Sequence, residues 1–299
     1  MTKITLLDGS IGQEIVKRSG DRPTSLWSTQ VMIDHPGMVA DIHRDYFDAG
    51  ATIATTNSYA IHRDRLVMGG LSPDLLPDLI DRAVAEAESA HKTHGSGRIA
   101  GALGPLAASY RPDICPPPHE AQTLYAELVG LMEARVDLFL IETASSVDQA
   151  EGALRGTVGT QKPVWLAVSV KDDDGAHLRS GEPVGALAQV IETYAPDAVL
   201  VNCSRPEAVT EALETVKGFG RPFGGYANGF VHISDGFLED SPTVDALEAR
   251  PDLGPKTYAR FAMDWVHRGA TIVGGCCEVG PDHIAELARQ LKDAGHEIV

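Results

Sequence analysis

The chain has 299 residues, which is long enough for one large domain or two ordinary ones with a sizeable hydrophobic core. It is 43% apolar and 22% charged, and this composition excludes wholesale disorder. Its 25 basic and 42 acidic residues give a formal charge of −17. That charge repels phosphate backbones and anionic lipids, so neither nucleic acid nor a membrane surface is an expected partner.

The first residues lack the apolar stretch of a signal peptide, and no run reaches the ~18 apolar residues of a membrane-spanning helix. Four cysteines are too few for a disulfide scaffold. We therefore expect a soluble, cytoplasmic protein in a reducing compartment. The sequence leaves open whether copies of the chain form a homo-oligomer.

Short β-branched apolar runs alternate with longer segments of helical period, a pattern typical of a parallel sheet with crossover helices. The expected strands cover residues 4–7, 51–56, 98–103, 137–142, 164–169, 198–202, 222–226 and 271–274. Eight such units predict an α/β fold, a single-domain (β/α)8 TIM barrel over residues 1–299, with a doubly wound open sheet as the alternative. Two loops stand out: residues 115–118, with three prolines, and the long connection at residues 228–256, which is a candidate lid.

The active site of such a barrel lies at the carboxyl ends of its strands. The polar and glycine residues that follow the expected strands are Asp8, Asn57, Tyr59, Gly104, Glu142, Thr143, Ser169, Lys171, Cys203, Asn228, Cys276 and Cys277. Three of the four cysteines therefore share one rim of the barrel, and the tips of strands six and eight are close enough for these side chains to converge.

Three converging thiolates predict a metal site. A set of three protein ligands with one open position is typical of catalytic zinc, and sulfur ligands favour zinc over magnesium or calcium. Cys276 and Cys277 can both turn inward only if the backbone leaves the strand there, and Gly274-Gly275 is expected to supply that freedom. Because three sulfurs make zinc a poor activator of water, the implied chemistry is attack by a substrate thiolate held on the metal.

Other interpretations of the same residues stay open. A lone Cys203 at a strand end is most often a small buried apolar residue, and the three cysteines could instead hold structural zinc or sense oxidants. A Schiff-base lyase would use Lys171 as its amine and Gly224-Gly225 as a phosphate loop. Cys115 lies outside the three-cysteine group.

Longer stretches of the chain resemble the homocysteine S-methyltransferase family. The matching segments are Leu6-Leu7-Asp8-Gly9-Ser10-Ile11-Gly12, Ser25-Leu26-Trp27-Ser28, the stretch from His35-Pro36 to Asn57-Ser58-Tyr59, Val201-Asn202-Cys203 and Gly274-Gly275-Cys276-Cys277. The resemblance covers nearly the whole chain. It implies zinc-dependent transfer of a methyl group from a small cationic donor to homocysteine, which forms methionine.

The resemblance also implies roles for individual residues. Cys203, Cys276 and Cys277 match the zinc ligands of the family, on which homocysteine enters as the fourth ligand. Asp8 and Gly9 match the motif that lines the amino-acid pocket, and Glu142, followed by Thr143, matches an acidic residue that binds the homocysteine ammonium group. Tyr59 matches a position near the transferred methyl group. Asn228 matches a position that could hold zinc when substrate is absent.

The methyl donor is the least determined part of this prediction. S-methylmethionine is the first choice, because Ser25-Leu26-Trp27-Ser28 and the compact length resemble members that use it, and betaine is second. The chain departs from common relatives at Asn228-Gly229-Phe230 and at Glu278, and both departures bear on the donor.

Overall fold

The computed structural model describes residues 2–21, 26, 28–238 and 247–299. Ser25 and Trp27 of the Ser25-Leu26-Trp27-Ser28 motif therefore lie outside the described residues, as does the 239–246 portion of the expected lid. Among the described residues, no helix is both long and apolar enough to cross a membrane.

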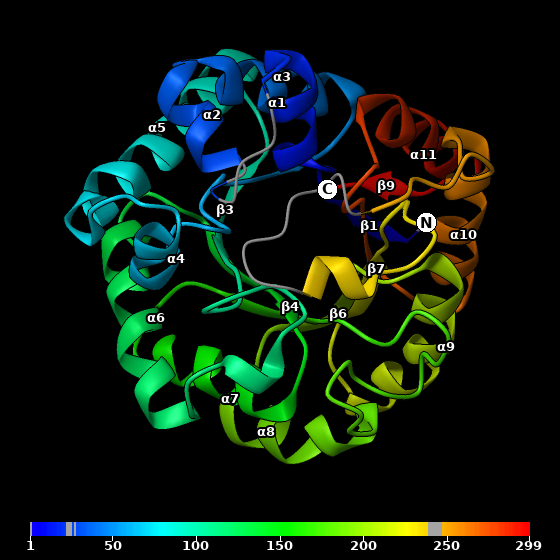
Figure 1. The fold of residues 1–299 in the computed structure, drawn as a ribbon. Helices are drawn as coiled ribbons and strands as arrows, with labels where there is room; N and C mark the ends of the chain where they lie inside the picture. The colour runs from blue at the N-terminus through cyan, green and yellow to red at the C-terminus, as the bar shows by residue number, and fades with distance from the viewer. Residues whose placement is uncertain (1, 22–25, 27, 239–246) are drawn as a thin grey trace.

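The eight predicted strands all form, and they follow one another around a parallel sheet (Figure 1). They are β1 (Lys3–Leu6), β2 (Ile53–Thr55), β3 (Arg98–Leu103), β4 (Leu138–Ala144), β5 (Val164–Val168), β6 (Ala198–Asn202), β7 (Phe223–Tyr226) and β8 (Ile272–Val273). The predicted single-domain α/β barrel is confirmed. The predicted boundaries differ from the observed ones by at most two residues.

Helices cover the outside of the sheet and form a ring around it in Figure 1. In chain order they are α1 (Ile11–Ser19), α2 (Ser28–Asp34), α3 (Met38–Ala49), α4 (Arg63–Met68), α5 (Leu76–His94), α6 (Pro118–Met132), α7 (Val147–Gly156), α8 (Ala188–Tyr194), α9 (Pro206–Val216), α10 (Pro255–His267) and α11 (Pro281–Asp293). Short 3-10 turns lie between them, at η1 (Pro73–Leu75), η2 (Pro112–Ile114), η3 (Val184–Leu187), η4 (Lys217–Phe219) and η5 (Asp235–Leu238).

The two faces of each strand enter different cores, as the period of two requires. In β4, Leu138 and Leu140 point into the barrel, whereas Phe139 and Ile141 pack against the outer helices. The barrel interior is filled by Leu7, Ile53, Ala100, Leu138, Leu140, Trp165, Ala167, Ala198, Leu200, Tyr226 and Ile272. Continuing the inward series by two residues places Glu142 at the open end of the barrel.

The sheet closes between β1 and β2 through few contacts. Leu7 forms a parallel bridge to Ile53, and the Thr52 amide donates to the Leu6 carbonyl at 2.7 Å. A ninth strand that the sequence analysis missed, β9 (Glu297–Ile298), pairs in parallel with the start of β1 (Figure 1). The Thr52 hydroxyl donates to a backbone oxygen of Val299 at 2.7 Å. The segment that contains β9 therefore stabilises the contact between β1 and β2 at the amino-terminal end of these strands.

We expect Thr52→Val to lower the free energy of unfolding by about 1 kcal/mol, because it removes the hydroxyl that joins β2 to the β1–β9 pair. Urea denaturation measures the change. Thr93→Val is the matched control, since the exposed Thr93 hydroxyl bonds only the Ser89 carbonyl of its own helix. Equal stabilities for the two variants would contradict a role for Thr52 in closing the barrel.

Candidate functional site

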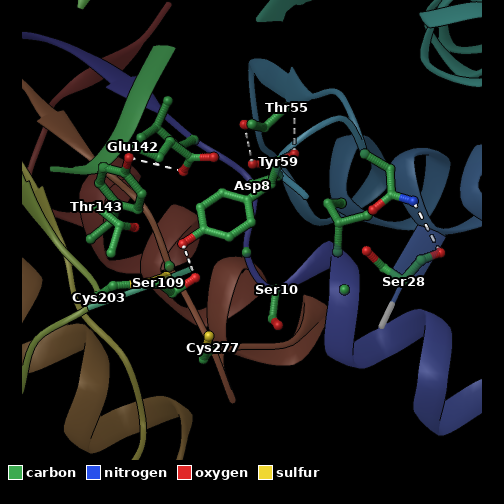
Figure 2. Close-up of a pocket in the computed structure, with 18 of the residues that line it drawn as sticks. Asp8, Ser10, Ser28, Thr55, Tyr59, Ser109, Glu142, Thr143, Cys203 and Cys277 are labelled. Carbon is green, nitrogen blue, oxygen red and sulfur yellow. Dashed lines mark hydrogen bonds between the residues drawn. A yellow bond between two sulfur atoms is a disulfide. The ribbon is translucent and has the colours of Figure 1, made fainter. Parts of the chain in front are cut away.

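A cavity of about 850 Å³, including its open mouth, lies at the carboxyl ends of the strands. Figure 2 shows residues from both ends of the chain and from its middle around this cavity. Its lining includes Asp8, Gly9, Ser10, Ser28, Thr55, Tyr59, Ser109, Tyr110, Glu142, Thr143, Cys203, Tyr226, Phe237, Leu247, Cys276 and Cys277. The structure thus gathers eight of the nine site residues predicted from the sequence.

Asp8 lies directly after β1 and is almost fully buried. Its carboxylate accepts hydrogen bonds from the Thr55 amide at 2.6 Å and the Thr55 hydroxyl at 2.8 Å, so it ties β1 to β2 at the cavity (Figure 2). Glycine is required at position 9, because a Cβ there would overlap the carbonyl oxygen of Val279 and the ring of Tyr46. The first predicted motif therefore serves the barrel seam as well as the cavity.

Glu142 and Thr143 both face the cavity although they are neighbours in β4. The register of β4 against β5 shifts between Ile141 and Ala144, and Thr143 has a positive φ of 59°. Such a conformation is unusual for a β-branched residue and persists only where surrounding groups hold it. The Asn202 side chain does so: it accepts from the Thr143 amide and donates to the Thr143 hydroxyl, each at 3.0 Å.

Two carboxylates face this cavity without a cationic side chain among its described lining residues. Burial raises the pKa of Asp8 to about 8, although its hydrogen bonds from Thr55 oppose the shift. Burial likewise raises the pKa of Glu142 to about 7, opposed by the hydrogen bond that the Tyr226 hydroxyl donates to it at 3.0 Å. The cavity is therefore suited to an ammonium group, which would stabilise both carboxylates in their charged forms.

The three predicted cysteines meet at one side of the cavity. The sulfur atoms of Cys203, Cys276 and Cys277 lie within 4.8 Å of one another. Cys203 and Cys276 are joined by a disulfide, and Cys277 carries a free thiol. Cys203 directly follows β6 with a φ of 47°, in the left-handed region.

Gly274 and Gly275 permit this arrangement in a different way from the one predicted. Neither has a positive φ, and the left-handed residue of this turn is Glu278, with a φ of 63°. Instead, a Cβ on Gly274 would overlap the side chain of Leu7, and one on Gly275 would overlap Val279. The glycines therefore let this turn pack closely against Leu7, directly after β1, and against Val279 at the carboxyl end of the turn.

The cysteine set fits a zinc ion once the disulfide is reduced. Tetrahedral zinc with Zn–S bonds of about 2.3 Å places ligand sulfurs ~3.8 Å apart, within the separation that this backbone already holds. The cavity beside the sulfurs leaves room for a fourth ligand from a substrate. Burial raises the pKa of the Cys277 thiol to about 12, so this cysteine is neutral without a metal and must lose its proton on metal binding.

Other candidate residues separate into two groups. Tyr59 lines the cavity, and its hydroxyl is 2.8 Å from the Ser109 hydroxyl (Figure 2). Asn228 is buried but does not line the cavity: its side-chain oxygen accepts from the Phe230 amide at 3.2 Å, and its side-chain nitrogen has no partner among the described residues. The zinc-holding role that the resemblance implied for Asn228 stays a prediction.

Sequence reasoning missed several lining residues. Tyr226 is the last residue of β7 and points inward, so reading the final inward position of each strand would have found it. Tyr110 lies in a loop and Phe237 in the short 3-10 turn η5; their ring centroids are 5.9 Å apart, and they pack with Cys203. No periodicity marks loop residues, and only the folded chain reveals that they form one wall of the cavity.

The rival interpretations find less support. Gly224 and Gly225 pair with Ile272 and Val273 inside the sheet, which leaves no phosphate loop there, and Lys171 is not among the described lining residues. A thiol sensor needs a low-pKa cysteine. Burial raises the pKa of both free thiols, Cys115 and Cys277, so neither has this property; Cys203 and Cys276 are joined in the disulfide.

Comparison with known proteins gives consistent matches over nearly the full chain. A model of the homocysteine S-methyltransferase family matches residues 5–291. The homocysteine S-methyltransferase YbgG of Bacillus subtilis is 26% identical, over 97% of this chain and 96% of its own. The homocysteine S-methyltransferase of Escherichia coli is 27% identical, over 95% of this chain and 94% of its own.

Solved structures give the same result. The metallated form of the homocysteine methyltransferase MmuM from Escherichia coli matches with a TM-score of 0.79 at 26% identity, over 96% of both chains. Its oxidized form matches with a TM-score of 0.80 at 26% identity, again over 96% of both chains. The backbone of the present chain is thus about equally similar to the metallated and the oxidized form of that enzyme.

The raised pKa of Asp8 predicts a pH-dependent stability. Between about pH 4 and 8 the folded protein keeps a proton on Asp8 that the unfolded chain releases, so stability falls as pH rises through this window. The side chain of Asp8→Asn stays neutral, so this variant lacks that loss. We therefore expect the difference in free energy of unfolding, variant minus wild type, to increase by about 1–3 kcal/mol from pH 5 to pH 7.

Urea denaturation of reduced, metal-free protein at both pH values measures this difference. Glu286→Gln is the matched control: its half-buried carboxylate lies outside the cavity, and hydrogen bonds from Arg289 and Gln290 lower its pKa to about 2, so it is ionised throughout the window. Parallel pH profiles for Asp8→Asn and the wild type would contradict the prediction.

Proposed function

Since the chain belongs to the homocysteine S-methyltransferase family, we propose that it transfers a methyl group to the thiol of homocysteine and so forms methionine. The observation that carries the proposal is the meeting of three cysteine sulfurs with two carboxylates, the buried Asp8 and the half-buried Glu142, in one cavity. The sulfurs suit a thiol substrate bound through a metal, and the carboxylates suit the ammonium group of an amino acid.

Cys203, Cys276 and Cys277 are proposed to hold zinc after the Cys203–Cys276 disulfide is reduced. Bound zinc would supply the acidity that keeps the homocysteine thiol deprotonated at neutral pH. The chain itself supplies the cavity wall that fixes where the substrate sulfur and the donor methyl group meet. Such alignment of two reactants removes much of the entropic cost of the transfer.

Glu142 and Asp8 are proposed to bind the homocysteine ammonium group. Both face the cavity, and Glu142 is fixed by the Tyr226 hydroxyl at 3.0 Å. An ammonium group beside Glu142 lowers the pKa of its carboxyl group, so binding fixes the charged form. The amino acid would then be anchored at its amino end, with its side-chain thiol reaching toward the cysteines.

S-methylmethionine is the proposed donor, because Ser25-Leu26-Trp27-Ser28 and the compact length resemble members that use it, and the described lining has no Lys, Arg or His to repel a cation. At neutral pH S-methylmethionine carries a sulfonium, an ammonium and a carboxylate, whereas betaine has no net charge. Tyr59, Tyr110 and Phe237 place aromatic rings in the lining, and aromatic rings attract a cation such as a sulfonium. The methyl group passes from the donor sulfur to the homocysteine sulfur, the homocysteine proton goes to solvent, and both partners become methionine.

Removal of one cysteine of the set tests the proposal. We expect reduced wild-type protein to hold one zinc per chain and Cys276→Ala to lose bound zinc and at least about 10³-fold in methionine formation, since the thiolate substrate loses its site. Cys115→Ala, outside the set, should retain both. Metal analysis and methionine formation from homocysteine with S-methylmethionine or betaine measure these effects.

Each outcome of that experiment has a defined meaning. Full turnover by Cys276→Ala would refute the proposed chemistry. Zinc with turnover on betaine alone would replace the proposed donor and keep the acceptor. A reduced wild-type protein that binds no zinc would refute the three-cysteine site.

Glu142→Gln tests the binding of the ammonium group. The amide keeps the size of the side chain and can still accept from Tyr226, but it cannot neutralise an ammonium group. We expect the KM for homocysteine to rise about 10-fold or more, the equivalent of ~1.4 kcal/mol for a lost charged hydrogen bond, while zinc content stays unchanged. An unchanged KM in steady-state kinetics would remove Glu142 from the acceptor site.

A further inference from the structure

Arg179 lies outside the cavity lining, in the loop between β5 and η3, yet its side chain contacts several parts of the site. Its guanidinium donates to the Ser169 hydroxyl at 2.7 Å and to the carbonyl oxygen of Cys203 at 3.0 Å. It also pairs with both carboxylate oxygens of Asp172, at 3.0 and 3.3 Å. The Arg179 and Asp172 side chains are only 10% and 11% exposed, so this ion pair is largely shielded from solvent.

The contact with Cys203 acts on a strained part of the backbone. Cys203 adopts a φ of 47°, which non-glycine residues keep only where neighbouring groups hold them. The carbonyl oxygen of Cys203 accepts from Arg179 and from the Ser169 hydroxyl, the latter at 3.2 Å. These bonds fix the peptide that follows the cysteine and hence the direction of its side chain.

Asp172 extends the same hydrogen-bond network to the segment from Phe230 to Phe237, which packs against the cysteines. Its Oδ2 atom accepts from the Ile233 amide at 2.8 Å. Ile233, Phe230 and Phe237 form a cluster that includes Cys203, with Cys276 and Cys277 packed against it. The ion pair therefore connects the backbone of Cys203 to the apolar cluster against which the other two cysteines pack.

The face of the guanidinium completes the network. Arg179 stacks on the ring of Tyr110, 4.5 Å from its centroid, and Tyr110 also lines the cavity. A planar guanidinium can make this stack and the fork of hydrogen bonds at the same time, which a lysine ammonium cannot. Because Asp172 balances the charge, the special property of Arg179 here is its shape.

We propose that Arg179, held by Asp172, is a positioning residue: it fixes Cys203 for metal binding and couples this cysteine to the segment that contains Ile233 and to the Tyr110 wall. The inference rests on the proposed zinc site, and it assigns Arg179 no contact with substrate or metal. Groups that orient metal ligands in this way typically change metal affinity 10- to 100-fold when they are replaced.

Arg179→Lys tests the proposal because it keeps the charge and removes the fork. We expect its zinc affinity, measured by competition with a chelator on reduced protein, to fall 10- to 100-fold. We also expect faster labelling of Cys203 by a thiol reagent in the reduced, zinc-free protein, measured by peptide mapping. Asp172→Asn should move both quantities in the same direction, because it weakens the hold on Arg179 and Ile233.

Arg135→Lys is the matched control: this arginine forms a comparable fork with Glu88 at 3.0 and 2.6 Å and does not line the cavity. It should leave zinc affinity and Cys203 labelling at wild-type values. Near-UV circular dichroism and urea midpoints identify any variant that fails to fold. If Arg179→Lys fails to fold, zinc affinity and Cys203 labelling in Asp172→Asn decide the proposal.

The outcomes separate this inference from the proposed function. Zinc affinity and labelling in Arg179→Lys equal to those in Arg135→Lys would overturn the role of Arg179. A wild-type protein without zinc affinity would overturn the proposed function, and the labelling rate of Cys203 would then decide whether Arg179 holds this cysteine. Slower or unchanged labelling would refute that hold.

Discussion

The parallel closure between β1 and β2 is the constraint on which the site depends. It is short, consisting of the Leu7–Ile53 bridge and the bonds that Thr52 and Asp8 make across it. Because it turns the sheet into a ring, the ends of β6 and β8 face one cavity, and Cys203 meets Cys276 across 73 residues of sequence. An open sheet would impose no such convergence on residues from every strand.

Charged carboxylates are unfavourable in this cavity unless a cation accompanies them. Asp8 and Glu142 are carboxylates withdrawn from water, and no Lys, Arg or His belongs to the described lining. A buried carboxylate without a cation protonates, which explains why burial raises the pKa of both. Asp8 is kept in place by Thr55, whose two hydrogen bonds also fasten the seam. Asp8 thus stabilises the barrel and also offers the cavity a carboxyl group that becomes charged when a cationic ligand binds.

The parts of this protein that the sequence predicts are those that repeat. Short β-branched apolar runs locate the eight strands, and the rule that barrel sites lie at strand ends locates Asp8, Glu142 and the three cysteines. The parts that it does not predict depend on contacts between distant segments. The strand β9 has only two residues, and Tyr110, Phe237 and Arg179 lie in loops or in a short 3-10 turn, where no periodicity marks them.

The conformation of Gly274-Gly275 shows the same limit at single residues. Two adjacent glycines indicate that the chain needs space or an unusual φ, and the sequence does not say which. The structure gives close packing at the glycines and assigns the left-handed conformation to Glu278 and Cys203. Both of those residues have side chains, so only their surroundings make the conformation acceptable.

Three residues near the cavity with a positive φ are held in the same way. Thr143, Cys203 and Glu278 each have a backbone in the left-handed region. A polar side chain from another segment holds each of them: Asn202 bonds Thr143, Arg179 bonds Cys203, and Gln13 bonds Glu278. These three bonds act on backbone atoms and none involves a sulfur atom. Breaking the Cys203–Cys276 disulfide therefore removes none of these three bonds, two of which hold the backbone at Cys203 and directly after Cys277. The scaffold thereby sets the positions of the sulfurs before any metal or substrate arrives, and this preorganisation limits the entropy that a ligand must lose on binding.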